Sequence, residues 1–273
     1  LSNYNGSSLK GAQICVVSNV SVGDLTGLQL AAYSNVTKGN LTGTQVSSFS
    51  NVAIGNATGA QISGFMNIAH GELSVVQSAG FINLAKTIKG PQIAGYINIA
   101  STESKSAQVA GYFNYTPYSR GIQLAGFSNV ATKGTQLSFI NYADSSSGIP
   151  IGFFSFVKKG YHVLELSGTE TFPVNIAFKT GVKRFYNIFE MGFGEDDIQL
   201  GYGLGTIVSL SKRLDASFDV TASHIVGYRN AHWEDDRYMA RFTPSLNFQA
   251  FERVGVAVGP SINLYVAETN TEG

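Results

Sequence analysis

Acid–base catalysis is the first chemistry that these residue types could support, because it needs only paired carboxylates or a carboxylate beside a base. Residues 1–157 contain four carboxylates and one histidine: Asp24, Glu72, Glu103, Asp144 and His70. Their spacings follow no common period and set no two of them as a pair. We therefore expect this half to be non-catalytic, and a polysaccharide-cleaving enzyme is a less favoured interpretation than a non-enzymatic protein.

Two acidic stretches in the second half hold residue types that bind hard cations: Glu195, Asp196, Asp197, Glu234, Asp235 and Asp236. Carboxylate oxygens suit Ca²⁺ or Mg²⁺, but the spacing is not that of an EF-hand loop. Acidic loops are also commonly just solvated. We expect no cofactor, and these six residues are the candidate ligands if either cation binds.

Other reactive motifs lack the pattern that their chemistry needs. Cys15 is the single cysteine, which excludes an internal disulfide and a cysteine-based zinc site. The histidines have no His-Glu-x-x-His spacing, and no Gly-x-Ser-x-Gly motif occurs. The stretch 201–205 resembles a dinucleotide loop but lies inside a strand pattern. Glycines facing a crowded interior explain it better.

Composition favours strands and tight turns over helices. The 273 residues include 31 glycines, and 18 basic residues balance 18 acidic ones. The zero net charge gives no reason to expect a nucleic acid partner. No run of 18 apolar residues occurs, so we expect no transmembrane helix.

A Gln and an Asn recur six residues apart through the first half, in phrases such as GTQVSSFSNVA and GAQISGFMNIA. The step between phrases is 15 or 16 residues until a shorter last unit. The Gln positions are Gln13, Gln29, Gln45, Gln61, Gln77, Gln92, Gln108, Gln123 and Gln136. The Asn positions are Asn19, Asn35, Asn51, Asn67, Asn83, Asn98, Asn114, Asn129 and Asn141. Asn3 lies one step before Asn19, so we expect further repeats upstream.

This period predicts a β-solenoid over residues 1–157. A coil of this length is too short for a helical repeat but holds two or three short strands, to which Ile62, Phe65 and Ile68 supply apolar side chains. Coils stack ~4.8 Å apart, so nine give a rod on the order of 40 Å long. Each amide would bond the amides above and below it, so we interpret both columns as structural ladders.

Residues 150–157 are expected to form a degenerate last coil that caps the solenoid. We place Pro150 at the Gln position and Phe156 at the Asn position, and large aromatic side chains would cover the open end.

Residues 158–273 change to a period of two, which predicts an antiparallel β-barrel. Seven strands are expected at about 161–168, 172–183, 185–194, 198–211, 213–227, 238–251 and 253–266. Their apolar faces are long enough to cross an outer membrane, whereas soluble strands are commonly ~5–6 residues long. The expected lipid-facing residues are Phe218, Phe242, Leu246, Phe248, Val256, Ile262 and Leu264. A soluble barrel or sandwich is the alternative.

The opposite face carries charges that we expect to form an internal salt-bridge network: Glu165, Lys179, Glu190, Asp215, Asp219 and Arg241. In an eight-stranded barrel such side chains fill the interior, so a pore is not expected. Bacterial barrels have even strand numbers. Seven visible strands therefore predict an eighth that is missing from this sequence or supplied otherwise, unless 150–157 belongs to the barrel.

Turn lengths predict the orientation of the barrel. The turns near 183–184, 212–213 and 252–253 are short, and those near 195–197 and 228–237 are longer, an asymmetry typical of outer-membrane barrels. Lys158 and Lys159 precede the first strand on the short-turn rim. That rim faces the periplasm in such barrels, which predicts a periplasmic solenoid.

The units GAQISGFMNIA, GPQIAGYINIA and GIQLAGFSNVA, followed by GFFSFVKKGYHVLELSGTETFPVNIAFKTGVKRFYNIF, resemble uncharacterised bacterial surface-repeat proteins. These carry tandem repeats of this type ahead of a small β-barrel. The resemblance spans nearly the whole chain and implies a Gram-negative envelope location. It supplies no activity and no catalytic residues, and it suggests the cell surface for the solenoid, in contrast to the turn lengths.

Two non-enzymatic functions follow from these patterns. The first is an outer-membrane protein whose barrel sits in lipid and whose solenoid is a scaffold for another envelope protein or a glycan. The alternative is a soluble secreted adhesin or glycan-binding solenoid. Dependence on detergent or lipid separates the two.

Overall fold

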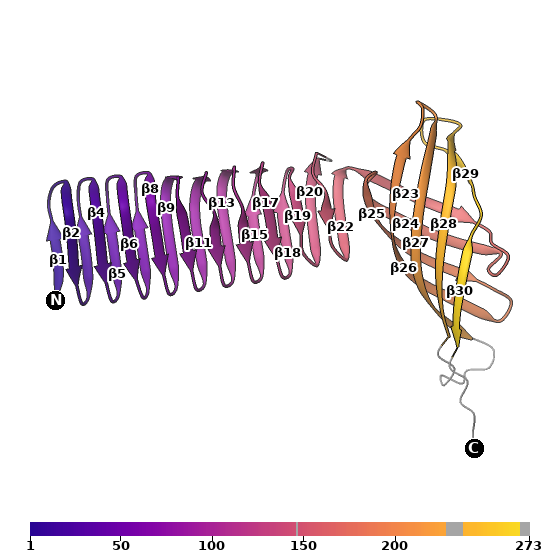
Figure 1. Cartoon of the computed structure of the whole chain (residues 1–273), viewed down its shortest axis with the longest axis horizontal. Coiled ribbons are helices and arrows are strands. Elements are labelled where there is room, and N and C mark those ends of the chain that lie inside the picture. Colours follow the sequence, from indigo (N-terminus) through magenta and orange to yellow (C-terminus); the bar gives the residue numbers. More distant parts are fainter. Residues whose placement is uncertain (146, 228–236, 268–273) are drawn as a thin grey trace, which may run out of the picture. The chain divides into compact units, whose positions relative to one another are not determined.

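A computed structural model describes residues 1–145, 147–227 and 237–267, and all of its elements are β-strands (Figure 1). Contacts divide the chain into two compact units, Leu1–Phe154 and Ser155–Gly273. The division falls three residues before the boundary expected from the sequence. No helix that could cross a membrane is found in the described part of the chain.

The first unit is a β-solenoid with two parallel strand columns, as the repeat predicts. The Gln column consists of β2 (Leu9–Cys15), β4 (Leu25–Ala31), β6 (Leu41–Ser47), β8 (Ala57–Ser63), β10 (Val76–Ala79), β12 (Gln92–Ala94), β14 (Gln108–Ala110), β17 (Ile122–Ala125), β19 (Thr135–Leu137) and β21 (Pro150–Ile151). The Asn column consists of β1 (Ser2–Asn5), β3 (Ser18–Ser21), β5 (Ser34–Thr37), β7 (Ser50–Ala53), β9 (Met66–Leu73), β11 (Ile82–Ile88), β13 (Ile97–Ser104), β15 (Phe113–Thr116), β18 (Ser128–Ala131), β20 (Ile140–Ser145) and β22 (Phe154–Lys159). The short β16 (Tyr118–Ser119) pairs with the end of β13.

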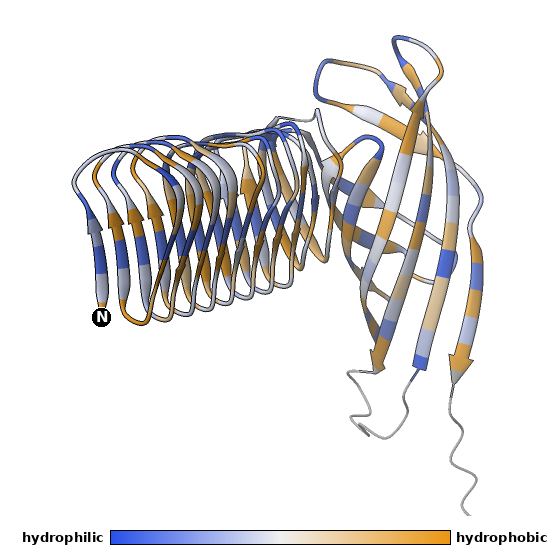
Figure 2. Ribbon diagram, turned by 60° about the vertical axis from the view of Figure 1, so that its left-hand side comes forward, coloured by the Kyte–Doolittle hydropathy of each residue, from blue (hydrophilic) through white to orange (hydrophobic). Residues whose placement is uncertain are grey.

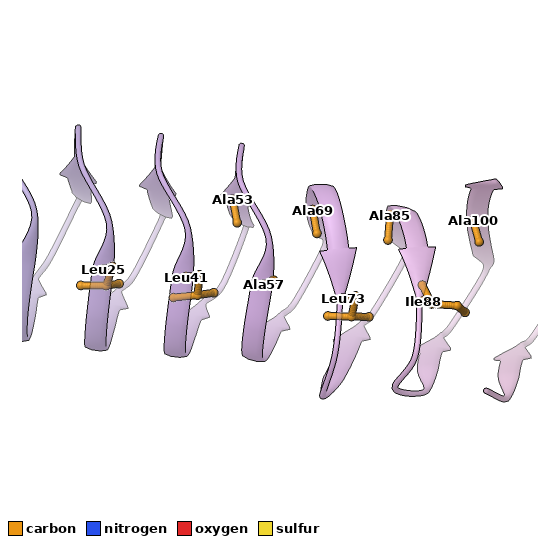
Figure 3. Packing of buried hydrophobic residues seen from close by; sticks show 9 residues of the cluster. All are labelled: Leu25, Leu41, Ala53, Ala57, Ala69, Leu73, Ala85, Ile88 and Ala100. Carbon is orange, nitrogen blue, oxygen red and sulfur yellow. The ribbon is translucent and has the colours of Figure 1, made fainter. Parts of the chain in front are cut away.

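The solenoid buries amides and small or aliphatic side chains and leaves its aromatic rings outside. Leucine, isoleucine and alanine from successive coils form one core cluster of two rows (Figure 3). One row holds Leu25, Leu41, Ala57, Leu73 and Ile88, and the other holds Ala53, Ala69, Ala85 and Ala100. Ile62 and Phe65 are 43% and 38% exposed. Because side chains alternate along a strand, burying Gln61 and Ser63 turns Ile62 outward.

The last coil differs from its prediction by one residue. Pro150 pairs with Gln136, as expected. Phe156 does not take the Asn position, which Ser155 occupies: the Phe154 amide donates to Phe139 O in the way that the Ile140 amide donates to Phe127 O. The prediction was wrong because the last two coils shorten the Gln-to-Asn spacing to five residues, and a slip of one residue exchanges the two faces.

The second unit is a curled antiparallel sheet, a half-barrel whose strands follow one another in chain order. It contains β23 (Tyr161–Ser167), β24 (Val174–Val182), β25 (Phe185–Phe193), β26 (Asp197–Ser209), β27 (Leu214–Gly227), β28 (Arg237–Gln249), β29 (Gly255–Val258) and β30 (Ile262–Ala267). Apolar and polar residues alternate along these strands (Figure 2).

The seventh predicted strand, 253–266, is split into β29 and β30, which both pair with β28. The register on either side of the split places Pro244 directly opposite Pro260. Neither proline has an N–H group to donate across the pair. The seventh predicted strand is therefore interrupted at Pro260, where it faces Pro244 of β28.

The expected difference in turn length holds only in part. One rim has connections of two, four and five residues, at 183–184, 210–213 and 250–254. The other rim has a loop at 168–173 but only three residues at 194–196, so the turn near 195–197 is not a long one. The expected long loop at 228–236 lies outside the described residues.

Candidate functional site

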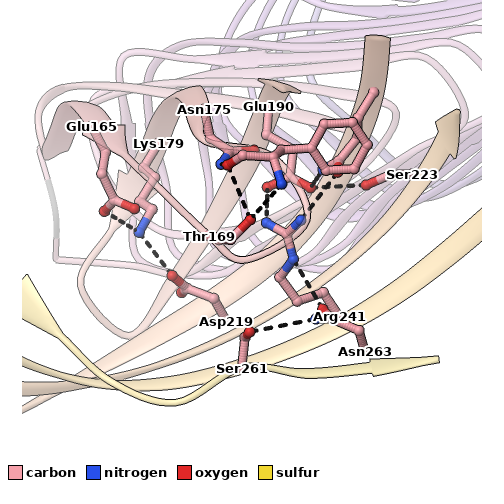
Figure 4. Close-up of polar contacts among 12 residues, drawn as sticks. Glu165, Thr169, Asn175, Lys179, Glu190, Asp219, Ser223, Arg241, Ser261 and Asn263 are labelled. Carbon is pink, nitrogen blue, oxygen red and sulfur yellow. Dashed lines mark hydrogen bonds and ion pairs between the residues drawn. The ribbon is translucent and has the colours of Figure 1, made fainter. Parts of the chain in front are cut away.

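Charged side chains on the inner face of the sheet form two clusters (Figure 4). In the first cluster Lys179 Nζ, from β24, donates to Glu165 Oε2 at 2.6 Å and to Asp219 Oδ2 at 2.8 Å. The Tyr186 hydroxyl donates to the other oxygen of Asp219 at 2.5 Å. The lysine and aspartate side chains are only 7% and 9% exposed, so each charge is neutralised within the protein.

The second cluster is centred on Arg241, from β28. Its guanidinium lies 3.7 Å from Glu190 Oε2 and donates to Gln199 Oε1 at 3.1 Å and to Asn263 Oδ1 at 3.2 Å. Glu190 Oε1 also accepts bonds from Gln199 Nε2 and Ser223 Oγ. The buried guanidinium and carboxylate thus have several polar partners each.

Apolar side chains pack beside these clusters. One group consists of Tyr161, Ala177, Tyr186, Ile188 and Ile207. The other consists of Phe172, Ile225 and Met239, with Phe172 reaching inward from the 168–173 loop and only 2% exposed. The interior of the sheet is therefore packed with side chains.

Five of the six charges expected in the interior belong to the two clusters, and Asp215 does not. Its carboxylate instead accepts from Lys183 Nζ at 2.8 Å, and that lysine is 53% exposed. Asp215 lies four residues before Asp219 on the same face of β27, close to the end of the strand. The sequence had not singled out Tyr186 or Asn263 as partners, because only the strand register brings them to Asp219 and Arg241.

Glycines in β26 make room for the clusters. A Cβ atom at Gly205 would lie 2.3 Å from both Asp219 Oδ1 and a Tyr186 ring carbon, whereas one at Gly194 would meet nothing closer than 3.5 Å. The glycines at 201–205 thus face a crowded interior, as the strand pattern predicts.

Replacing Gly205 with valine should therefore destabilise the sheet by about 1–3 kcal/mol, the usual cost of overpacking a core. Gly194→Ala is the matched control and should change the free energy of unfolding far less. Urea titrations of the two variants beside the parent chain measure the difference. Equal stability of all three would contradict the packed interior.

Most of the outer face of the sheet is apolar, with Thr206 and His224 as outward polar side chains. One row runs through Leu164, Phe178, Phe189, Tyr202, Ala222, Ala240 and Leu264. The seven residues expected to face lipid all point outward, with exposed fractions from 38% for Phe242 to 66% for Leu264. Within the described parts of β23–β30, Asp, Glu, Lys and Arg all fall at inward positions.

Two further polar side chains on this outer face, Asn187 and Thr180, lie where another segment covers them. Asn187 Oδ1 accepts from the Ser155 amide at 3.0 Å, and Thr180 Oγ1 donates to Ser155 O at 3.2 Å. Both side-chain positions are fully buried. The exposed part of the face is thereby left mainly apolar.

The acidic candidates for a cation are partly engaged elsewhere. Arg237 donates to both carboxylate oxygens of Asp197, at 2.7 and 3.0 Å. Glu234, Asp235 and Asp236 lie outside the described residues. In the described ranges no three His, Cys, Asp or Glu side chains are grouped as a metal site. The cation site stays a prediction.

The two amide columns of the solenoid form hydrogen-bonded ladders that run in opposite directions. Asn35 Nδ2 donates forward to Asn51 Oδ1 at 2.9 Å, and Gln45 Nε2 donates backward to Gln29 Oε1 at 2.7 Å. The same polarity holds along each column, and the Asn amides also donate to backbone carbonyls of the following coil, such as Val46 O at 2.7 Å. Because the two columns donate in opposite directions, the dipoles of their side-chain amides partly cancel.

The Gln ladder predicts that replacing glutamine by leucine destabilises the protein more at Gln77 than at Gln136. Gln77 donates to Gln61 and Leu84 O and accepts from Gln92, whereas the Gln136 Oε1 atom has no partner because Pro150 follows it. Gln77→Leu should leave the buried Gln92 Nε2 donor without its acceptor. It should therefore lower the free energy of unfolding by about 1–3 kcal/mol more than Gln136→Leu does. Thermal unfolding of the full chain, followed by circular dichroism, checks the order of the two variants.

Comparison with protein-family models, curated proteins and solved structures finds no match for this chain.

Proposed function

We propose that the protein is a non-enzymatic outer-membrane protein of a Gram-negative envelope. The curled sheet is an anchor in lipid, and the solenoid is a rigid scaffold that offers its surface to another envelope protein or a glycan. The observation that carries the proposal is the apolar outer face of the sheet, where rows of exposed aliphatic and aromatic side chains cross all the strands.

Strand length supports the anchor. β24 and β25 contain 9 residues each and β26, β27 and β28 contain 13, 14 and 13, whereas β23, β29 and β30 contain 7, 4 and 6. A strand that crosses a bilayer needs ~9–11, so the five central strands meet this length. A soluble protein rarely leaves an apolar patch of this extent uncovered. Lipid acyl chains would cover such an apolar face without any partner protein.

The interior supports an anchor rather than a channel. Charged side chains inside a membrane protein face inward and pair with one another, as Lys179 and Arg241 do with three carboxylates. The clusters and the Phe172 side chain occupy the space that a pore would need. No transport step is part of this proposal.

Of the turn lengths in the described sheet, the two-residue turn at 183–184 is the one that supports a periplasmic solenoid. Tyr161, the first residue of β23, pairs with Gly181 beside the two-residue turn at 183–184. Tight turns lie on the periplasmic side of outer-membrane barrels.

Detergent dependence tests the anchor. The full chain should float with lipid vesicles in a density gradient and should aggregate when detergent is removed without lipid. A chain that stays monodisperse in plain buffer and sediments away from vesicles would contradict the proposal.

A further inference from the structure

A stack of nine aromatic rings runs along one edge of the solenoid: Tyr33, Phe49, Phe65, Phe81, Tyr96, Tyr112, Phe127, Phe139 and Phe153. Ring centroids are 4.8–5.1 Å apart except for one step of 6.4 Å, between Phe127 and Phe139. The nine residues are 37–54% exposed. Since each ring covers its neighbour's face, the stack presents a ridge of ring edges, which we call the aromatic edge.

The aromatic edge carries no charge over its whole length. The stretch from the Gln position to the residue after the Asn position contains no Asp, Glu, Lys or Arg in any coil. The seven basic and four acidic residues of 1–157 all fall between these stretches: Lys10, Asp24, Lys38, Glu72, Lys86, Lys89, Glu103, Lys105, Arg120, Lys133 and Asp144. Some of them pair there, as Lys89 does with Glu72 at 2.8 Å. The solenoid is therefore amphipathic across its width.

A line of small residues follows the ridge. Ala, Ser or Gly precedes every ring of the stack. A Cβ atom at Gly80 or Gly95 would lie 2.1 Å from the carbonyl oxygen of the coil before, so side chains are excluded there. On the other side of these small residues lie outward aliphatic side chains such as Leu30, Ile62 and Ile93, which are 39–46% exposed. A ridge of rings beside a line of small residues with the same repeat can pack against a second copy of itself.

We propose that the aromatic edge is the contact surface for a second copy of this chain, with the ring ridge of each copy packed along the small residues of the other. Another stack of the same pitch matches the ridge ring for ring, as identical segments do in a steric zipper. A two-fold axis would make the two patches identical. A sugar would have to stack on ring faces, and these are covered by neighbouring rings.

The available area is sufficient for such a dimer. Aromatic residues bury about 150–250 Å² each, so nine that are about 40% exposed offer roughly 700 Å². The aliphatic column beside them adds to this. Stable interfaces bury ~800 Å² on each partner. The inference goes beyond the proposed function, because it holds whether or not the second unit lies in lipid.

Position-dependent cross-linking tests the dimer in the full chain. In a Cys15→Ser background, Tyr96→Cys places one thiol on the middle ring, which meets its own copy when the solenoids run in either direction. A short bismaleimide, added to the protein in vesicles and in detergent, should give at least fivefold more covalent dimer than it gives with Lys105→Cys, which lies among the charged residues away from the rings. Equal yields from the two variants, or no dimer from either, would overturn the proposal.

Two further measurements test the dimer, and the second does not require the Tyr96→Cys variant to fold. Adding Phe81→Lys and Tyr112→Lys to the Tyr96→Cys chain should abolish the cross-link, and an unchanged yield would show that another surface joins the copies. The parent chain should sediment as a dimer at micromolar concentration in detergent. Sedimentation as a monomer would contradict the proposal. Vesicle flotation of the same samples reports separately on the anchor.

Discussion

Phe242→Arg should destabilise the lipid-inserted protein by about 2–4 kcal/mol, the cost of an arginine on the lipid face at the bilayer midplane. Phe242 lies near the middle of β28 and points outward, with 38% of its surface exposed. Urea titration in vesicles, with folded and unfolded fractions separated on a gel, measures the change.

Phe248→Arg is the matched control, because Phe248 is also outward-facing but lies at the end of β28. Near the interface the same substitution costs only ~0–1 kcal/mol. If both outward residues were on the surface of a soluble sheet, arginine would change stability by no more than about 0.5 kcal/mol at either place. Equal small effects would therefore argue against lipid on this face.

Lys179→Met should destabilise the chain by about 3–5 kcal/mol, because it leaves the carboxylates of Asp219 and Glu165 without their buried cation. The same change at Lys183 is a close control. Both lysines lie 2.8 Å from an aspartate, but the Lys183 side chain is 53% exposed and the Lys179 side chain is 7% exposed. Exposed pairs contribute only ~0–1 kcal/mol.

The cost of Lys179→Met should fall when its partner is removed as well. Lys179→Met combined with Asp219→Leu replaces charges by apolar groups, which is often close to neutral. Free energies of unfolding for the two single variants and the double variant form a cycle. A simple sum of the single effects would show that the two side chains do not act as a pair.

Periodicity alone predicted the solenoid and the faces of the sheet. Identical residues at a fixed step must stack when coils are parallel, so Gln45 and Gln61 could be placed in one ladder before any coordinates. Alternation likewise placed Phe242 and Arg241 on opposite faces of one strand. Both inferences need only the chain's local geometry.

Features that depend on register between distant segments could not be predicted. Pro244 and Pro260 interrupt a strand because they meet, and each looked acceptable in its own alternating run. Phe172 was expected to begin a strand at about 172–183, but β24 begins at Val174 and Phe172 enters the interior from the loop before it. The rings of the aromatic edge were visible as a repeated Phe or Tyr, but their exposure followed only from the burial of the amides beside them.

Lipid contact along the outer face of the sheet is the central claim, and spin-label accessibility along β28 tests it most directly. Single cysteines at 238–249, in a Cys15→Ser chain reconstituted in vesicles, would carry the label. Collision with oxygen, which concentrates in lipid, should alternate with a period of two and peak at Ala240 and Phe242, while a water-soluble nickel reagent should reach neither. Strong collision of those outward labels with the nickel reagent, at the level of an exposed loop, would contradict the account.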